Sequence, residues 1–476
     1  MIINQNKLVL LTAASSFVNL LPIMAAETNP IINSQENKRP NIIFLLTDDQ
    51  RFDAAGFAGS KIVQTPNMDI LANKGVILRN AFATTPISAA SRASLLTGMY
   101  ERSHQFNFKT PPLSKELTDN SYPALLKKAG YYTGYIAKMG VVFEDKTYTK
   151  KNFDYYNEYM GNFYWRAVNN MTTLRHVTDI DGDNATEFIR NSPKNKPFFL
   201  CVGFNAPHAE DHSPQQYIWS PSSDSLYNKT VIPPPFMGEQ EWFEKLPVYV
   251  REGFNRVRWK WRFETPEHYQ QMVKGYFRMI SDIDNQIGRI MATLKEQGVA
   301  DNTIIVLMGD NGYFLGERGL ADKWLMYEQS IRIPMFIYNP TDSRYNQKEI
   351  NKLALNIDIP PTILALAGIN KPQQMQGESL TKLIEEPQTN WRTEYTCEHL
   401  CNWEGLPKSE GIRTEKWKYF RYLPDTLTEE LYNLETDPYE KVNLINDKKF
   451  AKIAATMREK SQVRIKELVS KQVQKK

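Results

Sequence analysis

The chain has 476 residues, of which 41% are hydrophobic and 24% are charged. This composition is typical of a soluble globular protein with enough residues for one large domain and a smaller one. The net charge of +4 is too small to indicate nucleic-acid binding, although it is compatible with a small anionic substrate.

The first segment with a distinct pattern is apolar. Lys7 precedes the run 8–26, which ends in two small residues before the polar sequence ETNP. This pattern is typical of a secretory signal peptide, which we assign to residues 1–26. An uncleaved membrane anchor is the alternative, but Ser15, Ser16, Asn19 and Pro22 interrupt the run, so we expect no stable membrane insertion. The mature protein is then exported, either to the periplasm or out of the cell.

Short, continuous apolar runs recur along the chain at 41–46, 197–202 and 303–308. Each has the length of a strand and lacks polar alternation, which favours strands buried on both faces of a largely parallel sheet. The stretches between them with helical spacing are 68–74, 122–129, 183–191 and 269–297. This alternation predicts an α/β domain, a large, mostly parallel sheet flanked by helices, over residues 38–376.

From about residue 377 the pattern changes to short β-rich pieces, such as KWKYFRYL and ELYNL, followed by a charged amphipathic tail at 448–476. We predict a smaller C-terminal α+β subdomain, residues 377–476, with an antiparallel sheet and a terminal helix. Residues 209–261 are rich in Pro, Trp and Tyr without clear periodicity. We expect them to form a long, ordered surface excursion of the kind that carries specificity.

Three cysteines are too few for a disulfide-built scaffold. Cys201 lies in the apolar run FFLCVGF and is expected to be buried. Cys397 and Cys401 flank His399 in the sequence CEHLC, which resembles a metal clip but has no fourth ligand nearby. A local disulfide or two free thiols is therefore the preferred interpretation.

Polar side chains follow three of the predicted strands. TDDQ, with Asp48 and Asp49, follows the first; NAPH, with His208, follows the second; GDNG, with Asp310 and Asn311, follows the third. Ligands of such sheets bind beyond the carboxyl ends of the strands. Any one of these acids alone would be read as a cap or turn residue. Together their hard oxygen donors predict a site for calcium or magnesium.

The segment SAASRASLLTG, residues 88–98, resembles the signature of the type I sulfatases of the alkaline phosphatase-like superfamily. In that signature, Cys or Ser is followed by x-Pro-Ser-Arg, three residues and Leu-Thr-Gly. Similar segments cover nearly the whole mature chain: NIIFLLTDDQR, GYYTGYIAK, FNAPH, MGDNGYFLGERGLADKW, and GIRTEKWKYFRY followed by ELYNLETDPYEKVNL. Serine at the first position is similar to the bacterial class that an oxygen-independent maturing enzyme oxidises.

The resemblance implies that Ser88 is converted to formylglycine (3-oxoalanine), whose hydrated diol attacks sulfur. A plain serine is a weak nucleophile, whereas a diol touching a cation is activated, and its second hydroxyl can then expel sulfate. The resemblance also assigns the remaining roles: one Ca²⁺ held by Asp48, Asp49, residue 88, Asp310 and Asn311; formylglycine held by Arg92 and Lys138; leaving alcohol protonated by His208; and sulfate bound by Lys323.

The chain departs from the family pattern at three positions. Gly140 replaces the histidine of the usual Lys-x-His, so another base or water must take the diol proton; His104 is a candidate, although a surface or capping role fits it equally. Arg318 stands where a histidine is common and could pair with a substrate anion or lie in a surface ion pair. Ala90 replaces the signature proline. His399 and Trp403 are further candidates to reach the substrate.

The first hypothesis is an exported sulfatase acting on a sulfated carbohydrate, such as a glycosaminoglycan, mucin or algal glycan fragment. Four tryptophans, at 219, 242, 259 and 261, and the basic run RVRWKWR suit such a substrate, although the tryptophans could equally serve the core. The second is a phosphatase or phosphodiesterase that uses unmodified Ser88; with only six histidines the chain lacks the ligands of metal-rich phosphatases. The third, prompted by Gly140, is a silent glycan-binding relative.

Overall fold

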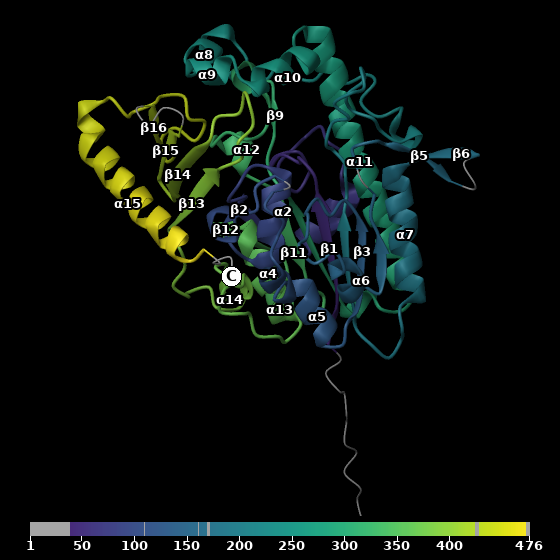
Figure 1. Cartoon of the computed structure of the whole chain (residues 1–476). Helices are drawn as coiled ribbons and strands as arrows, with labels where there is room; N and C mark the ends of the chain where they lie inside the picture. The colour runs from purple at the N-terminus through teal and green to yellow at the C-terminus, as the bar shows by residue number, and fades with distance from the viewer. Residues whose placement is uncertain (1–38, 109, 160, 169–171, 424–427, 473–476) are drawn as a thin grey trace, which may run out of the picture. The chain divides into compact units, whose positions relative to one another are not determined.

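The fold is known from a computed structural model (Figure 1). The structure describes residues 39–108, 110–159, 161–168, 172–423 and 428–472. The proposed signal peptide at 1–26 lies outside the described residues. Within the described part of the chain, no helix is both long and apolar enough to cross a membrane.

One eight-stranded sheet forms the centre of the unit Arg39–Lys476 (Figure 1). Its order is β12-β2-β11-β8-β1-β7-β3-β4, and β11 alone runs antiparallel to its neighbours. The strands are β1 (Asn41–Thr47), β2 (Val76–Phe82), β3 (Tyr132–Ala137), β4 (Tyr155–Asn157), β7 (Phe198–Gly203), β8 (Thr303–Gly309), β11 (Met335–Tyr338) and β12 (Lys348–Leu355). The predicted mostly parallel α/β fold is confirmed.

Strand β1 is apolar along its whole length because both of its faces are covered. Ile43 and Leu45 pack into one hydrophobic core, whereas Ile42, Phe44 and Leu46 pack into another on the opposite face. The helices over the first face are α1 (Pro66–Asn73), α7 (Val177–Asn191) and α11 (Pro266–Glu296); those over the second are α2 (Ser88–Thr97), α5 (Tyr122–Lys128) and α13 (Ile359–Leu366). The four helical stretches expected from the spacing correspond to α1, α5, α7 and α11.

A second, antiparallel sheet lies in the C-terminal part, as predicted. Its order is β13-β14-β15-β16, and α15 (Ala451–Ser470) packs against it (Figure 1). The strands are β13 (Glu394–His399), β14 (Ser409–Thr414), β15 (Trp417–Tyr422) and β16 (Glu429–Asn433). Both sheets belong to one compact unit, so the boundary between residues 376 and 377 stays a prediction.

The excursion at 209–261 is ordered and largely irregular. It contains a 3-10 helix at Pro221–Ser223 and three short α-helices, α8 (Gln240–Glu244), α9 (Val248–Arg251) and α10 (Phe254–Arg262), and Asn255 of α10 donates to the carbonyl of Ala321. The smaller elements elsewhere are α3 (Glu101–His104), α4 (Lys115–Asp119), α6 (Tyr148–Asn152), α12 (Glu328–Ile331), α14 (Thr381–Glu385), β5 (Trp165–Val168), β6 (Thr173–His176), β9 (Phe314–Leu315) and β10 (Ala321–Asp322).

A buried charge cluster joins the second sheet to the main body. Lys418 of β15 is fully buried; its Nζ lies 3.0 Å from Glu328 Oε1 and forms an ion pair with Glu440. The N–H of Glu328 donates to Glu440 Oε2 at 2.9 Å, and Arg413 contacts Glu328 at 3.1 Å. The lysine therefore neutralises two carboxylates that water does not reach.

Replacing Lys418 with methionine is expected to lower the free energy of unfolding by about 3–5 kcal/mol, because a buried carboxylate loses its cation. Thermal and chemical unfolding of the variant would measure the loss. In the double variant Lys418→Met/Glu440→Gln we expect a smaller loss, since one unpaired charge is removed as well. Equal stability of the single variant and the original protein would contradict the role given to Lys418.

Candidate functional site

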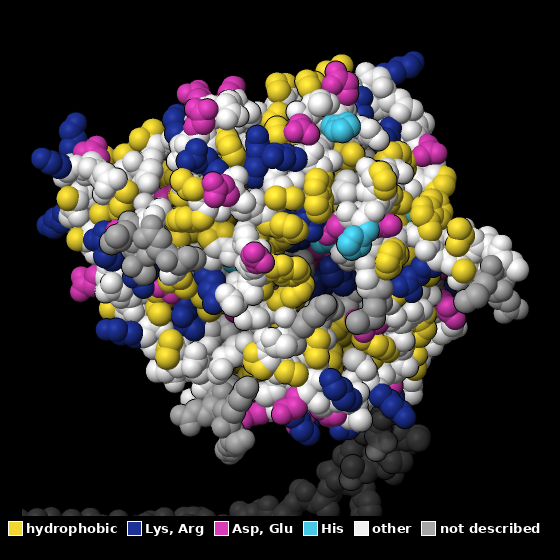
Figure 2. All heavy atoms as spheres, turned by 45° about the horizontal axis from the view of Figure 1, so that its top comes forward, with side chains coloured by type: hydrophobic (Ala, Val, Ile, Leu, Met, Phe, Trp, Pro, Cys, Tyr) yellow, Lys and Arg dark blue, Asp and Glu magenta, His cyan; other side chains and the backbone are white. Residues whose placement is uncertain are grey.

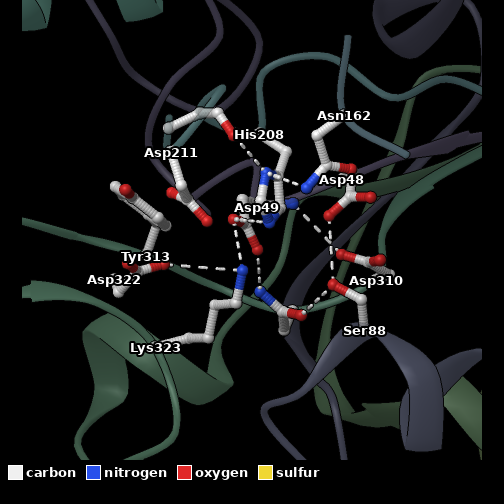
Figure 3. Close-up of polar contacts among 12 residues, drawn as sticks. Asp48, Asp49, Ser88, Asn162, His208, Asp211, Asp310, Tyr313, Asp322 and Lys323 are labelled. Carbon is white, nitrogen blue, oxygen red and sulfur yellow. Dashed lines mark hydrogen bonds and ion pairs between the residues drawn. The ribbon is translucent and has the colours of Figure 1, made fainter. Parts of the chain in front are cut away.

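The strand register brings the candidate metal ligands together. Strand β1 pairs in parallel with β7 and β8, so that Leu46 lies opposite Gly203 and Thr47 opposite Gly309. Asp48 and Asp310 each come one residue after the paired strand ends. The Asp310 N–H donates to Thr47 O at 2.9 Å, and the Asp48 N–H donates to Ala206 O at 3.2 Å. The ends of three strands thus form one floor, shown in Figure 3.

Asp49 is turned into this floor by a left-handed backbone. Its φ is +63°, a conformation that Asp tolerates better than most residues. Its N–H donates to Asp310 Oδ1 at 3.1 Å, and Tyr276 Oη donates to its carbonyl at 2.7 Å. The amide of Asn311 donates to Asp49 Oδ1 at 2.7 Å. All four residues (Asp48, Asp49, Asp310 and Asn311) are fully buried.

Ser88 stands at the first position of α2 and faces the acids. Its Oγ lies 3.0 Å from Asp48 Oδ1 and 3.2 Å from Asn311 Oδ1. Every residue of α2 is buried, and its alanines and serines are small enough for the helix to lie close to the strand ends. The side chain of Ser88 is therefore held among carboxylates, with 8% of the residue exposed.

The other two serines of the signature have structural partners. Ser91 Oγ donates to the Asp310 carbonyl at 2.6 Å and accepts from Asn356 Nδ2 at 3.0 Å. Ser94 Oγ lies 3.0 Å from His104 Nε2. One hydroxyl thus reaches the site, while the other two fix the helix that presents it.

Three cations surround the buried acids. Arg92 Nε donates to Asp310 Oδ2 at 2.9 Å, and its Nη2 lies 3.3 Å from Asp48 Oδ2. Lys138 forms an ion pair with Asp48, and Lys323 Nζ donates to Asp49 Oδ2 at 2.5 Å. Burial would raise the pKa of Asp48, but Lys138 and Arg92 hold it well below its usual range.

The negative charges of two other acids in the cluster are less fully neutralised by nearby cations. Burial raises the pKa of Asp49 to about 7 although Lys323 opposes the shift, and burial together with Asp48 raises the pKa of Asp310. Both shifts show that this floor favours additional positive charge.

His208 enters the site from the loop after β7. Its Nδ1 lies 2.7 Å from the Ala209 carbonyl, so this nitrogen carries the hydrogen. Its Nε2 lies 3.6 Å from Asp49 Oδ2 and is directed at the cluster. Burial and the nearby Lys323 and Lys138 keep the pKa of His208 well below its ordinary value.

The donor set fits a hard divalent cation. Asp48, Asp49 and His208 can place one ligand atom each within 4.8 Å of one another. Ser88 Oγ has one hydrogen but two oxygen neighbours within 3.2 Å, so at most one of these contacts can be its donated hydrogen bond. A cation bound among these oxygens would satisfy the excess of acceptors.

The structure places three sequence candidates away from this cluster. Both ring nitrogens of His104 have partners nearby in the chain: Nε2 lies 3.0 Å from Ser94 Oγ, and Nδ1 accepts from the Phe106 N–H at 3.1 Å. Burial lowers the pKa of His104 to about 3. His104 is therefore a packed structural residue, and its candidacy as the substitute base is not supported. His399 is fully buried in β13, where it pairs with Ser409 across the sheet.

Arg318 also has a structural role rather than the substrate contact expected. Its φ of +57° turns the side chain toward the C-terminal part, where Nη2 donates to the carbonyls of Tyr439 at 3.0 Å and Glu440 at 2.6 Å. Its guanidinium also lies over the Tyr327 ring, 4.4 Å from the centroid. The residue thus ties the loop after β9 to the segment after β16.

The cysteines are free thiols in the structure, which excludes the disulfide alternative. Cys201, Cys397 and Cys401 are all buried. Cys397 packs in the core between the two sheets, and Cys401 packs in a small cluster beside Ile87. Neither thiol lies in a cluster of metal ligands among the described residues.

Sequence reasoning missed two acids that border the site, Asp211 and Asp322, and placed Arg262 only within the basic run RVRWKWR. Arg262 is fully buried and donates to Asp322 Oδ2 at 2.8 Å and to Asp211 Oδ1 at 2.7 Å. Asp322 in turn lies 3.5 Å from Lys323 Nζ. Asp322 could have been noticed as the neighbour of Lys323, but Asp211 lies in the irregular segment, where no periodicity marks a position.

The comparisons with known proteins agree with this architecture. The sulfatase family matches residues 40–369, and the family described as N-sulphoglucosamine sulphohydrolase, C-terminal, matches residues 316–467. The chain belongs to the sulfatase family. It is thus an enzyme, a sulfuric ester hydrolase, as the resemblance of its motifs implied.

Relatives and solved structures resemble the chain over most of its length. An N-acetylglucosamine-6-O-sulfatase of Bacteroides thetaiotaomicron is 29% identical over 91% of this chain and 88% of its own length. An arylsulfatase of Clostridium perfringens is 30% identical over 87% of this chain and 91% of its own. A protein solved in complex with its substrate, D-glucosamine-2-N,6-O-disulfate, has 26% identity and a TM-score of 0.76, covering 90% of this chain and 98% of its own.

Calcium at about 100 times its dissociation constant is expected to stabilise the folded protein by about 2.7 kcal/mol. In Asp310→Asn we expect the calcium-dependent rise in melting temperature to shrink, because the sequence predicts Asp310 to be one of the charged ligands. Calorimetric titration with Ca²⁺ would measure the affinity directly. Asp154→Asn, which alters a partly buried carboxylate bonded to the Thr133 N–H, is the matched control. An unchanged calcium response in Asp310→Asn would contradict the assignment.

Proposed function

We propose that this sulfatase removes sulfate from a sulfated carbohydrate, using Ser88 after its oxidation to formylglycine. The observation that carries the proposal is the placement of Ser88 Oγ, 3.0 Å from Asp48 Oδ1 and 3.2 Å from Asn311 Oδ1, inside a ring of cations. Beside it, the side chains of His208 and Lys138 are partly exposed, at 12% and 19%. An anionic ester arriving there meets a fixed arrangement of positive charge.

Oxidation of Ser88 solves a chemical problem of the site. An unmodified serine that attacked sulfur would remain esterified, because it has no second oxygen to expel the sulfate. A hydrated formylglycine has two hydroxyls on one carbon, so that one forms the bond to sulfur while the other later loses its proton and releases sulfate, restoring the aldehyde. A sulfatase-maturing enzyme is the partner that this chemistry requires.

The proposed cation site consists of oxygen ligands alone and does not include His208. Asp48, Asp49, Asp310 and Asn311 would hold one divalent ion together with the oxygen of residue 88, and an all-oxygen set of this kind favours calcium. The bound ion would withdraw electron density from the sulfate oxygens and lower the pKa of the attacking hydroxyl.

The cationic side chains are proposed to act on the charge that develops during attack. Arg92 and Lys138 hold residue 88 in place and stabilise negative charge on its oxygens. Lys323, fixed by Asp49 at 2.5 Å and Asp322 at 3.5 Å, binds a sulfate oxygen. His208 Nε2, the ring nitrogen directed at the cluster, faces the ester oxygen; the bound anionic ester would raise the pKa of His208, so that Nε2 takes a proton from water and gives it to the leaving alcohol.

At Gly140, where the family has a histidine, both the backbone conformation and the nearby Arg92 disfavour a larger residue. Gly140 has a φ of +72°, and a Cβ added there would lie 3.0 Å from Arg92 Cδ. A histidine at this position would therefore need both a strained backbone and a displaced arginine. We propose instead that water takes the proton of the attacking hydroxyl, since Lys138 and Arg92 hold the pKa of Asp48 well below its usual range and leave it a weak base.

The proposed substrate class draws on the relatives. One acts, by its name, on N-acetylglucosamine 6-sulfate, and a structural neighbour was solved with a disulfated glucosamine as its substrate. Together with the apolar signal-like segment at 8–26, this supports an enzyme that meets glycan fragments in the periplasm or outside the cell.

Ser88→Ala is expected to reduce sulfate release by more than about a thousandfold, because the nucleophile is removed and each tenfold loss is worth about 1.4 kcal/mol. The peptide spanning residues 88–92, isolated from protein made in its own host, should have lost two hydrogen atoms relative to serine. Full activity with an unaltered serine would overturn the formylglycine proposal.

The same assay separates the alternatives. A panel of monosulfated sugars, a small aryl sulfate and an aryl phosphate is offered to the unaltered enzyme and to Ser88→Ala. Release of phosphate in preference to sulfate would favour the phosphatase hypothesis. Binding of sugars without release of either anion would favour the silent glycan-binding hypothesis.

A further inference from the structure

Helix α10 is fastened to the segment that carries Lys323. Asn255 Nδ2 donates to the carbonyls of Ala321 at 2.7 Å and Lys323 at 2.8 Å. The Phe254 ring lies 5.9 Å, centroid to centroid, from the ring of Trp324, which follows Lys323. The irregular segment therefore carries α10 to the border of the reactive cluster and holds it there.

Arg258 is the central side chain of the helix face next to the site. Its guanidinium lies between two rings, 4.7 Å from the Phe254 centroid and 4.8 Å from that of Trp261, and it forms an ion pair with Asp211. About 10% of its side chain is exposed. The rings and the carboxylate fix the plane of the guanidinium before any ligand arrives.

Besides its ion pair with Arg258, Asp211 is held by Arg262. Arg262 Nη2 donates to its Oδ1 at 2.7 Å, and the remaining donors of Arg262 are engaged by Gln216 at 2.9 Å and by Asp322 at 2.8 Å. The Asp211 side chain nevertheless remains 22% exposed. In the view of Figure 3, its carboxylate is drawn to the left of His208.

Trp261 is the exposed aromatic residue next to Arg258. It is 43% exposed, whereas Trp219 and Trp259 pack against the main core and Trp242 lies against Lys245. Its ring meets Phe254 edge to face, with centroids 6.2 Å apart, so the ring is braced while one side faces solvent. On the face turned forward in Figure 2, hydrophobic and basic side chains lie side by side around the centre.

We propose that Asp211, Arg258 and Trp261 form the binding surface for the sugar ring that bears the sulfate ester. This inference rests on the proposed function and adds the residues that select the leaving alcohol. The Asp211 carboxylate accepts hydrogen bonds from sugar hydroxyls, the Arg258 guanidinium donates to hydroxyl oxygens, and the Trp261 ring packs on the C–H face of the ring. The opposite charges of Asp211 and Arg258 cancel, which suits neutral hydroxyls.

The geometry separates this surface from the groups that act on sulfur. Among the interactions of the described residues, none of the three side chains contacts Ser88, Asp48 or Asp310. They connect to the reactive cluster through Asp322, which Arg258 reaches directly at 3.7 Å and Asp211 reaches through Arg262, and through Phe254 and Trp324. A sugar sulfate therefore uses both sets of residues, whereas a small aryl sulfate, which has no ring hydroxyls, uses the reactive cluster alone.

The test compares kcat/KM for two substrates in the calcium-loaded, fully oxidised enzyme. One is a small aryl sulfate; the other is the best substrate among monosulfated sugars that include N-acetylglucosamine 6-sulfate. In Trp261→Ala and in Asp211→Asn we expect the sugar value to fall roughly 10- to 100-fold, as for a lost ring contact or a charge-assisted hydrogen bond. The aryl sulfate value should change less than about threefold, within the scatter expected of a substitution away from the reacting groups.

Phe236→Ala is the matched control, since Phe236 is also an exposed aromatic residue, at 48%, and its ring packs on Tyr439. It should leave both values unchanged. Equal losses on both substrates would show that Asp211 or Trp261 only supports the reactive cluster, and unchanged sugar turnover would show that neither binds the sugar; either result overturns the inference. If the unaltered enzyme cleaves the aryl sulfate but no sugar sulfate, the proposed carbohydrate specificity itself fails.

Discussion

Three carboxylates buried at the ends of β1 and β8 impose the main constraint on this protein. Moving such charges out of water is costly unless cations accompany them, and the chain supplies Arg92, Lys138 and Lys323 from three separate segments. Each cation is itself buried or nearly so, and each is fixed by the acids that it neutralises. The same electrostatic requirement that stabilises the folded site therefore also fixes the positive charges around the space where an anionic ester would bind.

The fold meets this requirement through the central position of β1. Because β1 is covered on both faces and paired on both edges, the loop that follows it cannot move without disturbing two hydrophobic cores. Helix α2 approaches that loop closely because its residues are small, and Ser91 fastens it to the backbone of Asp310. The reactive side chain and the acids are thus parts of one rigid structure. Specificity, in the proposal made here, resides in α10 and the irregular segment before it.

The sequence predicted those parts of the molecule that have a regular hydrophobic pattern or a family motif. Asp48 and Asp310 could be placed together because each follows a continuous apolar strand, and parallel strands end at one edge. Asp211 could not be placed, since it lies in a segment without periodicity whose path depends on contacts with α10. Arg318 and His104 show a different limit. Their residue types suit a substrate, but a left-handed backbone directs Arg318 to distant carbonyls, and the fold packs His104 against Ser94.

The complete burial of α2 affects when, relative to folding, residue 88 can be reached by another protein. Under the proposed oxidation of Ser88, a maturing enzyme has to hold residue 88 in its own active site, which requires a short length of backbone to be free of its surroundings. Once α2 is enclosed on all sides, such access requires the floor to open. The proposal therefore places the oxidation before folding, while the chain is newly made.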